Sequence, residues 1–480
     1  MIPHLIPLPK NITCNPETVA LSPALYCGCE DFLPAAEVFV KYASALTGKS
    51  FSLCADPGTN GGIHLALDNT LAPESYTLTA EKGITLTAAS AVGINHALAT
   101  LLQLIDPAAC TISVCRITDQ PDCQFRGCMI DLARNWHDFN LLLDYVDMCW
   151  FYKIPMLHLH FTDDQSYTLP SRIYPNLSTE NRHYSLEQIR QLTDYAAARG
   201  VEIIPEIDVP GHCTSFSESY PELFGHKIIT QTAASMAAMK ALFTELCELF
   251  PHSRYIHIGG DEAAILAWGE DENCRSYVEA LGIDFDMPDK KLLSERLLAN
   301  FVQQMADAVF TCGRIPLAWE GFAECVNQYV SKDILLFSWE NYYQTAPQLL
   351  DGGFRIINGS WNPMYIVTPT PCWSQEEVFN WTIYDWTPVH PGSPYIGSSL
   401  HIEPDDQVIG GWLLAWGDKI SSEFETVAEG VLAEQALVEE RAPLLSENTW
   451  HVQKVRSYSD IKTAYDALCG KLTLLKKADR

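Results

Sequence analysis

Basic residues are scarce in this chain, and long apolar stretches are missing. Lysine and arginine number 31 against 60 aspartates and glutamates, which gives the 480 residues a formal net charge of −29. Nucleic acids and anionic membranes carry phosphates that repel such a protein, so we expect neither as a partner. No apolar run reaches the length of a membrane span, and the first ten residues do not resemble an export signal. The sequence therefore predicts a cytoplasmic protein.

Cysteine pairs of the C-x-x-C type are also missing. The 16 cysteines are spread from Cys14 to Cys469, and several, such as Cys149 and Cys247, lie inside apolar segments. This pattern favours reduced, buried thiols in the cytoplasm over a disulfide framework or a zinc ribbon.

The first quarter of the chain differs from the rest in its pattern of strand-like and helical segments. The apolar content of 47% allows a large core, and the length suits about two or three domains. Residues 1–117 contain short strand-like runs, such as 76–80 and 83–88, and amphipathic helices near 35–46 and 91–104. They predict a small α+β domain without a group of residues suited to chemistry.

From residue 118 onward, apolar strand-like segments alternate with helical segments. Eight strands in one such series predict an α/β fold, a (β/α)8 TIM barrel at 118–440, followed by a helical extension at 441–480. An open, doubly wound sheet is the structural alternative. The expected strands are 125–132, 154–161, 201–207, 255–258, 315–319, 334–339, 355–358 and 409–416.

Two adjacent carboxylates, Asp261 and Glu262, follow the fourth of these strands. Neighbouring residues of a strand point to opposite faces, so both acids can reach one pocket only if the backbone bends, and Gly259 and Gly260 permit this. Two carboxyl groups in different environments are what acid-catalysed cleavage of a glycosidic bond requires. The alternative is the start of a helix, where acids cap free amides.

Tryptophans recur at or just after the ends of the last four strands. Sugar rings bind between aromatic walls, with hydrogen bonds to their hydroxyl groups, and the active site of a barrel lies where the strands end. A single tryptophan is more often part of a core, but four in succession favour a sugar site. These residues are Trp319, Trp339, Trp361 and Trp416.

Four motifs in one order resemble glycoside hydrolase family 20, the β-N-acetylhexosaminidases. They are 125–127 (FRG), 157–165 (LHLHFTDDQ), 205–212 (PEIDVPGH) and 257–262 (HIGGDE). The resemblance covers about 118–420, and the first domain is similar to one that often precedes it. It implies exo-acting, retaining removal of terminal β-linked N-acetylglucosamine or N-acetylgalactosamine, in which the substrate's own acetamide oxygen attacks the anomeric carbon. It implies no cofactor and no metal, and leaves a homo-oligomer open.

The resemblance also implies roles for individual residues. Glu262 acts as the general acid, with a pKa raised by an apolar setting. Asp261 orients the acetamide and stabilises the positive intermediate, and Tyr365 donates its hydroxyl to the acetamide oxygen. Trp319, Trp339 and Trp416 wall the sugar, while Arg126 reaches its O3 and O4 side, with Asp163 and His212 completing or supporting that rim.

Two departures from the family pattern lie at the sugar's rim. Tyr365-Ile366-Val367 lacks the carboxylate that the family usually has in this tripeptide, near C6 of the sugar. Asp418, in Trp416-Gly417-Asp418, is one methylene shorter than the usual glutamate on the O4 side. We expect altered discrimination at C4 and C6, such as a preference for N-acetylgalactosamine or tolerance of a modified C6; a disaccharide-releasing enzyme is a further alternative.

Two other classes of function remain as alternatives: a metal-dependent hydrolase and a sugar-binding protein without activity. His158 and His160 share a strand face and, with Asp261, predict a metal-dependent barrel hydrolase if they bind an ion. A sugar-binding relative without activity would lack the acid pair, which is intact here.

Overall fold

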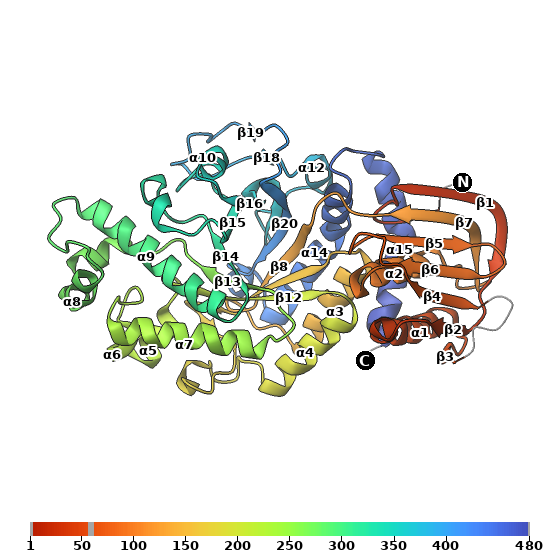
Figure 1. Ribbon diagram of the computed structural model, residues 1–480, viewed down its shortest axis with the longest axis horizontal. Coiled ribbons are helices and arrows are strands. Elements are labelled where there is room, and N and C mark those ends of the chain that lie inside the picture. Colours follow the sequence, from red (N-terminus) through yellow and green to blue (C-terminus); the bar gives the residue numbers. More distant parts are fainter. Residues whose placement is uncertain (1–2, 56–61, 479–480) are drawn as a thin grey trace.

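The computed structural model describes residues 3–55 and 62–478. An N-terminal α+β domain lies beside a barrel of parallel strands, with both visible in Figure 1. Among the described residues, no helix has the length and apolar character needed to cross a membrane. The 16 cysteines all lie in the described ranges and are free thiols.

The N-terminal domain is built on a mixed sheet of seven strands. Along β5, buried Tyr76, Leu78 and Ala80 alternate with half-buried threonines, because one face of the sheet packs against helices. Helices α1 (Leu33–Thr47) and α2 (Ala91–Leu104) confirm the two expected helices. In spatial order the strands are β1 (Asn11–Ala20), β7 (Thr111–Asp119), β5 (Tyr76–Ala80), β6 (Ile84–Ala88), β4 (Ile63–Leu67), β2 (Ala24–Cys27) and β3 (Ser52–Cys54).

The second part confirms the (β/α)8 barrel and excludes the open sheet, because the last strand of the series pairs with the first and with the seventh. All pairings within the barrel are parallel. The eight strands are β8 (Phe125–Asp131), β9 (Met156–His160), β12 (Glu202–Val209), β13 (Tyr255–Gly259), β14 (Ile315–Trp319), β15 (Leu335–Ser338), β16 (Arg355–Asn358) and β20 (Val408–Trp416). Each overlaps a strand expected from the sequence.

A ninth strand, β17 (Tyr365–Val367), completes the barrel at its C-terminal end. The first half of β20 pairs with β16, and the second half, Leu414–Trp416, pairs with β17. At Gly410, β20 passes so close to β8 that an added Cβ would lie 1.8 Å from the carbonyl oxygen of Phe125. The arrangement brings Tyr365 beside the end of β20.

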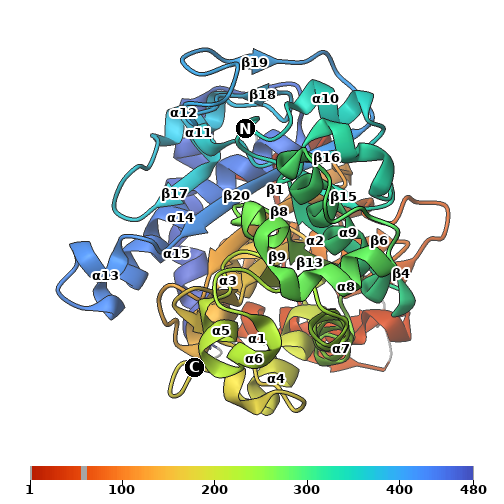
Figure 2. The same cartoon turned by 90° about the vertical axis from the view of Figure 1, so that its left-hand side faces the viewer.

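Helices surround the barrel, as Figure 2 shows from the end opposite the N-terminal domain. The long ones are α3 (Phe139–Phe151), α4 (Leu186–Ala198), α7 (Ala233–Leu249), α9 (Lys290–Thr311) and α14 (Val427–Trp450). Shorter ones are α5 (Thr214–Ser219), α6 (Pro221–Phe224), α8 (Glu272–Ala280), α10 (Ala346–Asp351), α11 (Trp361–Met364), α12 (Gln375–Asn380) and α13 (Ile420–Glu423). Small antiparallel pairs in the loops are β10 (Thr162–Asp163) with β11 (Ser166–Tyr167) and β18 (Asp385–Trp386) with β19 (Leu400–His401).

The C-terminal segment joins the two parts of the molecule. The boundary expected after residue 440 falls inside α14, a single helix that ends at Trp450. The following α15 (Tyr458–Ala478) buries five apolar side chains and packs against α1 and α3. The Lys471 ammonium donates to the backbone oxygens of Gln103 and Ile105, so the basic tail is anchored on the N-terminal domain.

Arg126 lies at the interface of the two domains, and the expectation that it binds sugar is wrong. It is the second residue of β8, so its side chain sits at the end of the barrel opposite the strands' C-terminal ends. The fully buried guanidinium donates to Glu74 at 2.5 Å and to the Cys123 carbonyl, and it lies 5.1 Å from the ring of Trp450. Arg126 therefore holds the domains together.

We predict that Glu74→Ala destabilises the fold by about 3 kcal/mol or more, since it leaves the buried Arg126 guanidinium without its carboxylate. Urea unfolding would measure this. Glu81→Ala is the matched control, because Glu81 pairs with Arg116 in the same domain at the surface and should cost far less. Equal losses for the two variants would contradict the prediction.

Candidate active site

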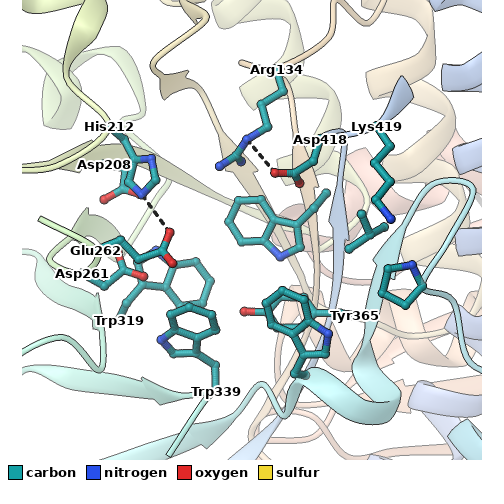
Figure 3. Close-up of a pocket in the computed structure, with 14 residues that line it drawn as sticks. Arg134, Asp208, His212, Asp261, Glu262, Trp319, Trp339, Tyr365, Asp418 and Lys419 are labelled. Carbon is teal, nitrogen blue, oxygen red and sulfur yellow. Dashed lines mark ion pairs between the residues drawn. The ribbon is translucent and has the colours of Figure 1, made fainter. Parts of the chain in front are cut away.

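A cavity of about 370 Å³ opens at the C-terminal ends of the barrel strands (Figure 3). Its size falls in the class of small-molecule sites, roughly 300 to 1,000 Å³. Acidic, basic and aromatic side chains from seven strand ends meet there. The lining residues are Arg134, Asp208, His212, Asp261, Glu262, Trp319, Trp339, Trp361, Tyr365, Val367, Pro371, Trp416, Asp418 and Lys419.

The backbone after β13 turns sharply, as expected from its two glycines. Gly259 and Gly260 have φ of 70° and 116°, and a Cβ on Gly259 would come within 1.9 Å of the Asp208 carboxylate. No α-helix starts at the acid pair; a short 3-10 helix begins at Ile265. The turn therefore aims Asp261 and Glu262 at one cavity.

The two acids occupy different environments. Asp261 is 6% exposed, and its Oδ1 has no hydrogen-bond partner among the described residues. Burial, together with the nearby charges of Asp208 and Glu262, raises its pKa well above 3.8. The Glu262 side chain is 51% exposed at the cavity mouth.

The pKa of Glu262 is lowered, which contradicts the expected rise. The cause is His212, whose Nε2 lies 3.4 Å from the Glu262 carboxylate and favours its charged form. The buried acid therefore keeps its proton to higher pH than the acid at the mouth.

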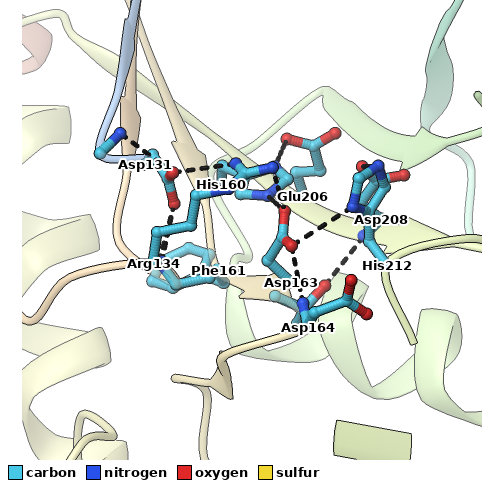
Figure 4. Close-up of polar contacts among 12 residues, drawn as sticks. Asp131, Arg134, His160, Phe161, Asp163, Asp164, Glu206, Asp208 and His212 are labelled. Carbon is cyan, nitrogen blue, oxygen red and sulfur yellow. Dashed lines mark hydrogen bonds and ion pairs between the residues drawn. The ribbon is translucent and has the colours of Figure 1, made fainter. Parts of the chain in front are cut away.

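Charged side chains behind the cavity hold His212 in place (Figure 4). Its Nδ1 lies 3.3 Å from Asp163, which also accepts from His160 at 2.9 Å and from Arg134 at 2.9 Å. Asp163 does not line the cavity, so it supports the rim through His212 and Arg134.

Arg134 occupies the cavity wall where Arg126 was expected. Its guanidinium pairs with Asp131 at 2.9 Å and Asp418 at 3.3 Å, and lies 5.0 Å from the ring of Trp416. The sequence signal was its place just beyond the first strand's C-terminal end, whereas Arg126 stands near that strand's start.

Aromatic rings form the opposite wall. Trp339 stacks on Trp361 with ring centroids 6.1 Å apart and planes at 25°, and Trp361 lies 4.6 Å from Tyr365. Trp319 and Trp416 are 5.9 Å apart. The structure thus brings together the three predicted tryptophans and Tyr365, and adds Trp361, which the sequence placed at a strand end without a role.

A single buried carboxylate, Glu206, supports this wall. It accepts from Trp319 Nε1 at 2.7 Å, from His158 at 3.0 Å and from His160 at 2.6 Å. The Nδ1 atom of His257 lies 2.8 Å from the same carboxylate. Burial opposes its charge, but the neighbouring histidines hold its pKa well below 4.5.

Three clusters of side chains in the described residues have ligand atoms close enough to hold an ion, and Asp261 is in none of them. Two of these clusters share Glu206, whose two oxygens already accept three hydrogen bonds, so an ion there would have to displace protein donors.

Four further lining residues were missed as site residues. Asp208, whose pKa burial raises to about 7, lies in the third motif of the sequence. Val367 and Lys419 adjoin the predicted Tyr365 and Asp418 in the chain, and no sequence signal marks Pro371. Val367 and Lys419 reach the cavity because β17 and β20 end side by side.

A parallel barrel with a carboxyl pair in an aromatic-walled cavity at its C-terminal face is the arrangement expected of a barrel glycoside hydrolase. Comparison with known families agrees. The model of the glycosyl hydrolase family 20 catalytic domain matches residues 123–452, and the model of domain 2 of that family matches residues 2–120. The chain belongs to glycosyl hydrolase family 20.

Curated relatives include a beta-hexosaminidase of Vibrio furnissii, 30% identical over 335 residues, which cover 62% of this chain and 53% of the relative. The beta-hexosaminidase subunit beta of Rattus norvegicus is 26% identical over 375 residues, covering 73% and 65%. The chain thus spans between half and two thirds of the length of these relatives.

Solved structures show the same fold. The exo beta-N-acetylglucosaminidase of Vibrio harveyi, solved with N-acetylglucosamine, has a TM-score of 0.78 at 22% identity, covering 99% of this chain and 78% of that one. The beta-N-acetylhexosaminidase of Bacteroides fragilis has a TM-score of 0.77 at 20% identity, covering 99% and 96%.

Proposed function

We propose that the protein is an exo-acting, retaining β-N-acetylhexosaminidase that removes a terminal β-linked N-acetylglucosamine or N-acetylgalactosamine. The observation that carries this proposal is the different setting of two adjacent acids in one cavity. Asp261 is buried with an oxygen that has no hydrogen-bond partner among the described residues, and Glu262 lies at the cavity mouth. Family membership and the names of the relatives support it.

Glu262 suits the general acid because of its exposure. A leaving group at the cavity mouth would cover its carboxyl and remove water, which raises its pKa and restores the proton that His212 otherwise disfavours. After the leaving group departs, the same carboxylate can take a proton from water.

Asp261 and Tyr365 suit the sugar's acetamide group. The unpaired Asp261 Oδ1 can accept the acetamide N–H, and the Tyr365 hydroxyl projects into the cavity, where it can donate to the acetamide oxygen (Figure 3). Burial and the charge of Asp261 raise the pKa of Tyr365 well above 10, so it stays a donor at neutral pH.

An oriented acetamide can attack the anomeric carbon from within the substrate, which explains retention without an enzyme nucleophile. Trp319, Trp339 and Trp416 exclude water from the resulting oxazolinium ion. The positive charge that develops on the acetamide favours the ionised form of Asp261, which then stabilises the ion. Arg134 and Asp418 stand across the cavity from the acid pair, which supports one terminal sugar and therefore exo action.

We predict that Glu262→Gln lowers kcat/KM on an aryl β-N-acetylglucosaminide by roughly 100- to 10,000-fold, the usual worth of general acid catalysis. Glu403→Gln, an exposed carboxylate outside the cavity, should leave the rate unchanged. A chelator should have no effect on the native chain; loss of activity that added metal restores would instead support the metal-dependent hydrolase.

The pH profile offers a second test. The alkaline limb of kcat, which reports Glu262 in the substrate complex, should lie at higher pH than that of kcat/KM, which reports the free protein. His212→Asn removes the cation that lowers the pKa of Glu262, so its kcat/KM limb should move to higher pH. The exposed His183→Asn serves as the control. An unmoved limb in His212→Asn would contradict the assignment.

The sugar preference depends on the rim at C4. Asp418 is held by Arg134 at 3.3 Å with 47% of its side chain exposed, so its carboxylate can reach a sugar hydroxyl. We predict that Asp418→Glu changes the ratio of rates on aryl N-acetylglucosaminide and N-acetylgalactosaminide by about threefold or more, the effect of a weakened hydrogen bond. An unchanged ratio would remove Asp418 from the determinants of specificity.

A further inference from the structure

Three cationic side chains line the cavity, and one of them lacks a carboxylate partner. Arg134 is paired with three aspartates, and His212 lies beside Asp163, Asp208 and Glu262. Lys419 makes no ion pair with any residue in the described ranges. In a chain with a formal charge of −29, such an ammonium group in a cavity needs an explanation.

Local contacts hold the Lys419 ammonium at the cavity edge. It donates to the backbone oxygen of Thr370 at 2.5 Å, and that loop is closed by a hydrogen bond from the Val367 N–H to the Pro371 carbonyl. Val367 and Pro371 also line the cavity and offer apolar surface. The neighbouring Asp418 carboxylate is engaged by Arg134, so the ammonium keeps donors for a ligand.

The proposed function fixes which part of the sugar reaches Lys419, and the inference rests on it. With C1 at Glu262 and the C2 acetamide at Asp261, the opposite edge of the pyranose ring carries O4 and C6. Figure 3 shows Lys419 and Asp418 on the side of the cavity away from these two acids. Arg134 and Asp418 form the polar pair of that side, which leaves C6 for the wall of Lys419, Val367 and Pro371.

We propose that the cavity accepts an N-acetylhexosamine with an anionic ester, a sulfate or a phosphate, on its C6 oxygen, and that Lys419 binds the ester. Both groups present several oxygens to an ammonium and form charge-assisted hydrogen bonds, which are about twice as strong as neutral ones. The ester stays intact while the glycosidic bond is hydrolysed. A cavity edge with a free cation favours such a sugar over the neutral one.

The test compares kcat/KM for 4-nitrophenyl β-N-acetylglucosaminide with that for its 6-sulfate and 6-phosphate, using the whole chain. In Lys419→Met, which keeps the unbranched side chain but removes the ammonium, the ratio of ester to neutral rates should fall roughly 10- to 100-fold, the worth of one hydrogen bond to a charged group. Lys419→Arg should retain most of the ratio. Lys291→Met, at an exposed lysine of α9 outside the cavity, should retain all of it.

Comparing kcat/KM for the 6-sulfate with that for the 6-phosphate shows which ester the cavity prefers. A second measurement uses free sugars as inhibitors. In the native protein, inhibition by N-acetylglucosamine 6-sulfate or 6-phosphate should weaken as ionic strength rises, and inhibition by N-acetylglucosamine should not. This measurement needs no variant to fold. Neutral hydrolysis with no advantage for either ester, or an equal ratio in Lys419→Met, overturns the inference but leaves the proposed function standing. No hydrolysis of any of the three substrates by folded protein overturns both.

Discussion

The charge of Glu206 is the interaction on which the catalytic end of the barrel depends. A fully buried carboxylate is costly unless its oxygens are hydrogen-bonded, and here His158 and His160 of β9 and Trp319 of β14 supply three donors. His257 of β13 lies 2.8 Å from the same carboxylate. His160 faces a carboxylate with each ring nitrogen, so it carries both protons and links Glu206 to Asp163. Removing Glu206 would leave several buried donors unpaired at once.

This network explains how two adjacent acids come to behave differently. Asp163 fixes His212 beside Glu262, and that cation lowers the pKa of the acid at the mouth. Asp261 lies deeper, next to Asp208, where burial and like charge raise its pKa. In the proposed mechanism, the same chain segment thus carries one acid that responds to the leaving group and another that responds to the acetamide.

Opposite charges are distributed unevenly around the cavity. The side near β12 and β13 pairs its charges densely, while the end of β20 leaves the Lys419 ammonium without a carboxylate. A sugar bound between these sides would meet catalytic groups at C1 and C2 and recognition groups at O4 and C6. Chemistry and specificity can therefore change independently, because different strands supply them.

The sequence by itself determined the eight strands, the acid pair and the tryptophan wall, because apolar runs, two glycines and residues at strand ends are local signals. It did not lead to the right arginine, although it carried a signal: Arg134 follows the C-terminal end of β8 and reaches the cavity, whereas Arg126 stands near the start of that strand, between the two domains. Nor did it predict the direction of the Glu262 pKa shift, which His212 sets from a loop 50 residues away in the chain. Val367 and Lys419 join the site through the pairing of β17 with β20. Charge and contact across strands are long-range quantities, so only the tertiary structure decided them.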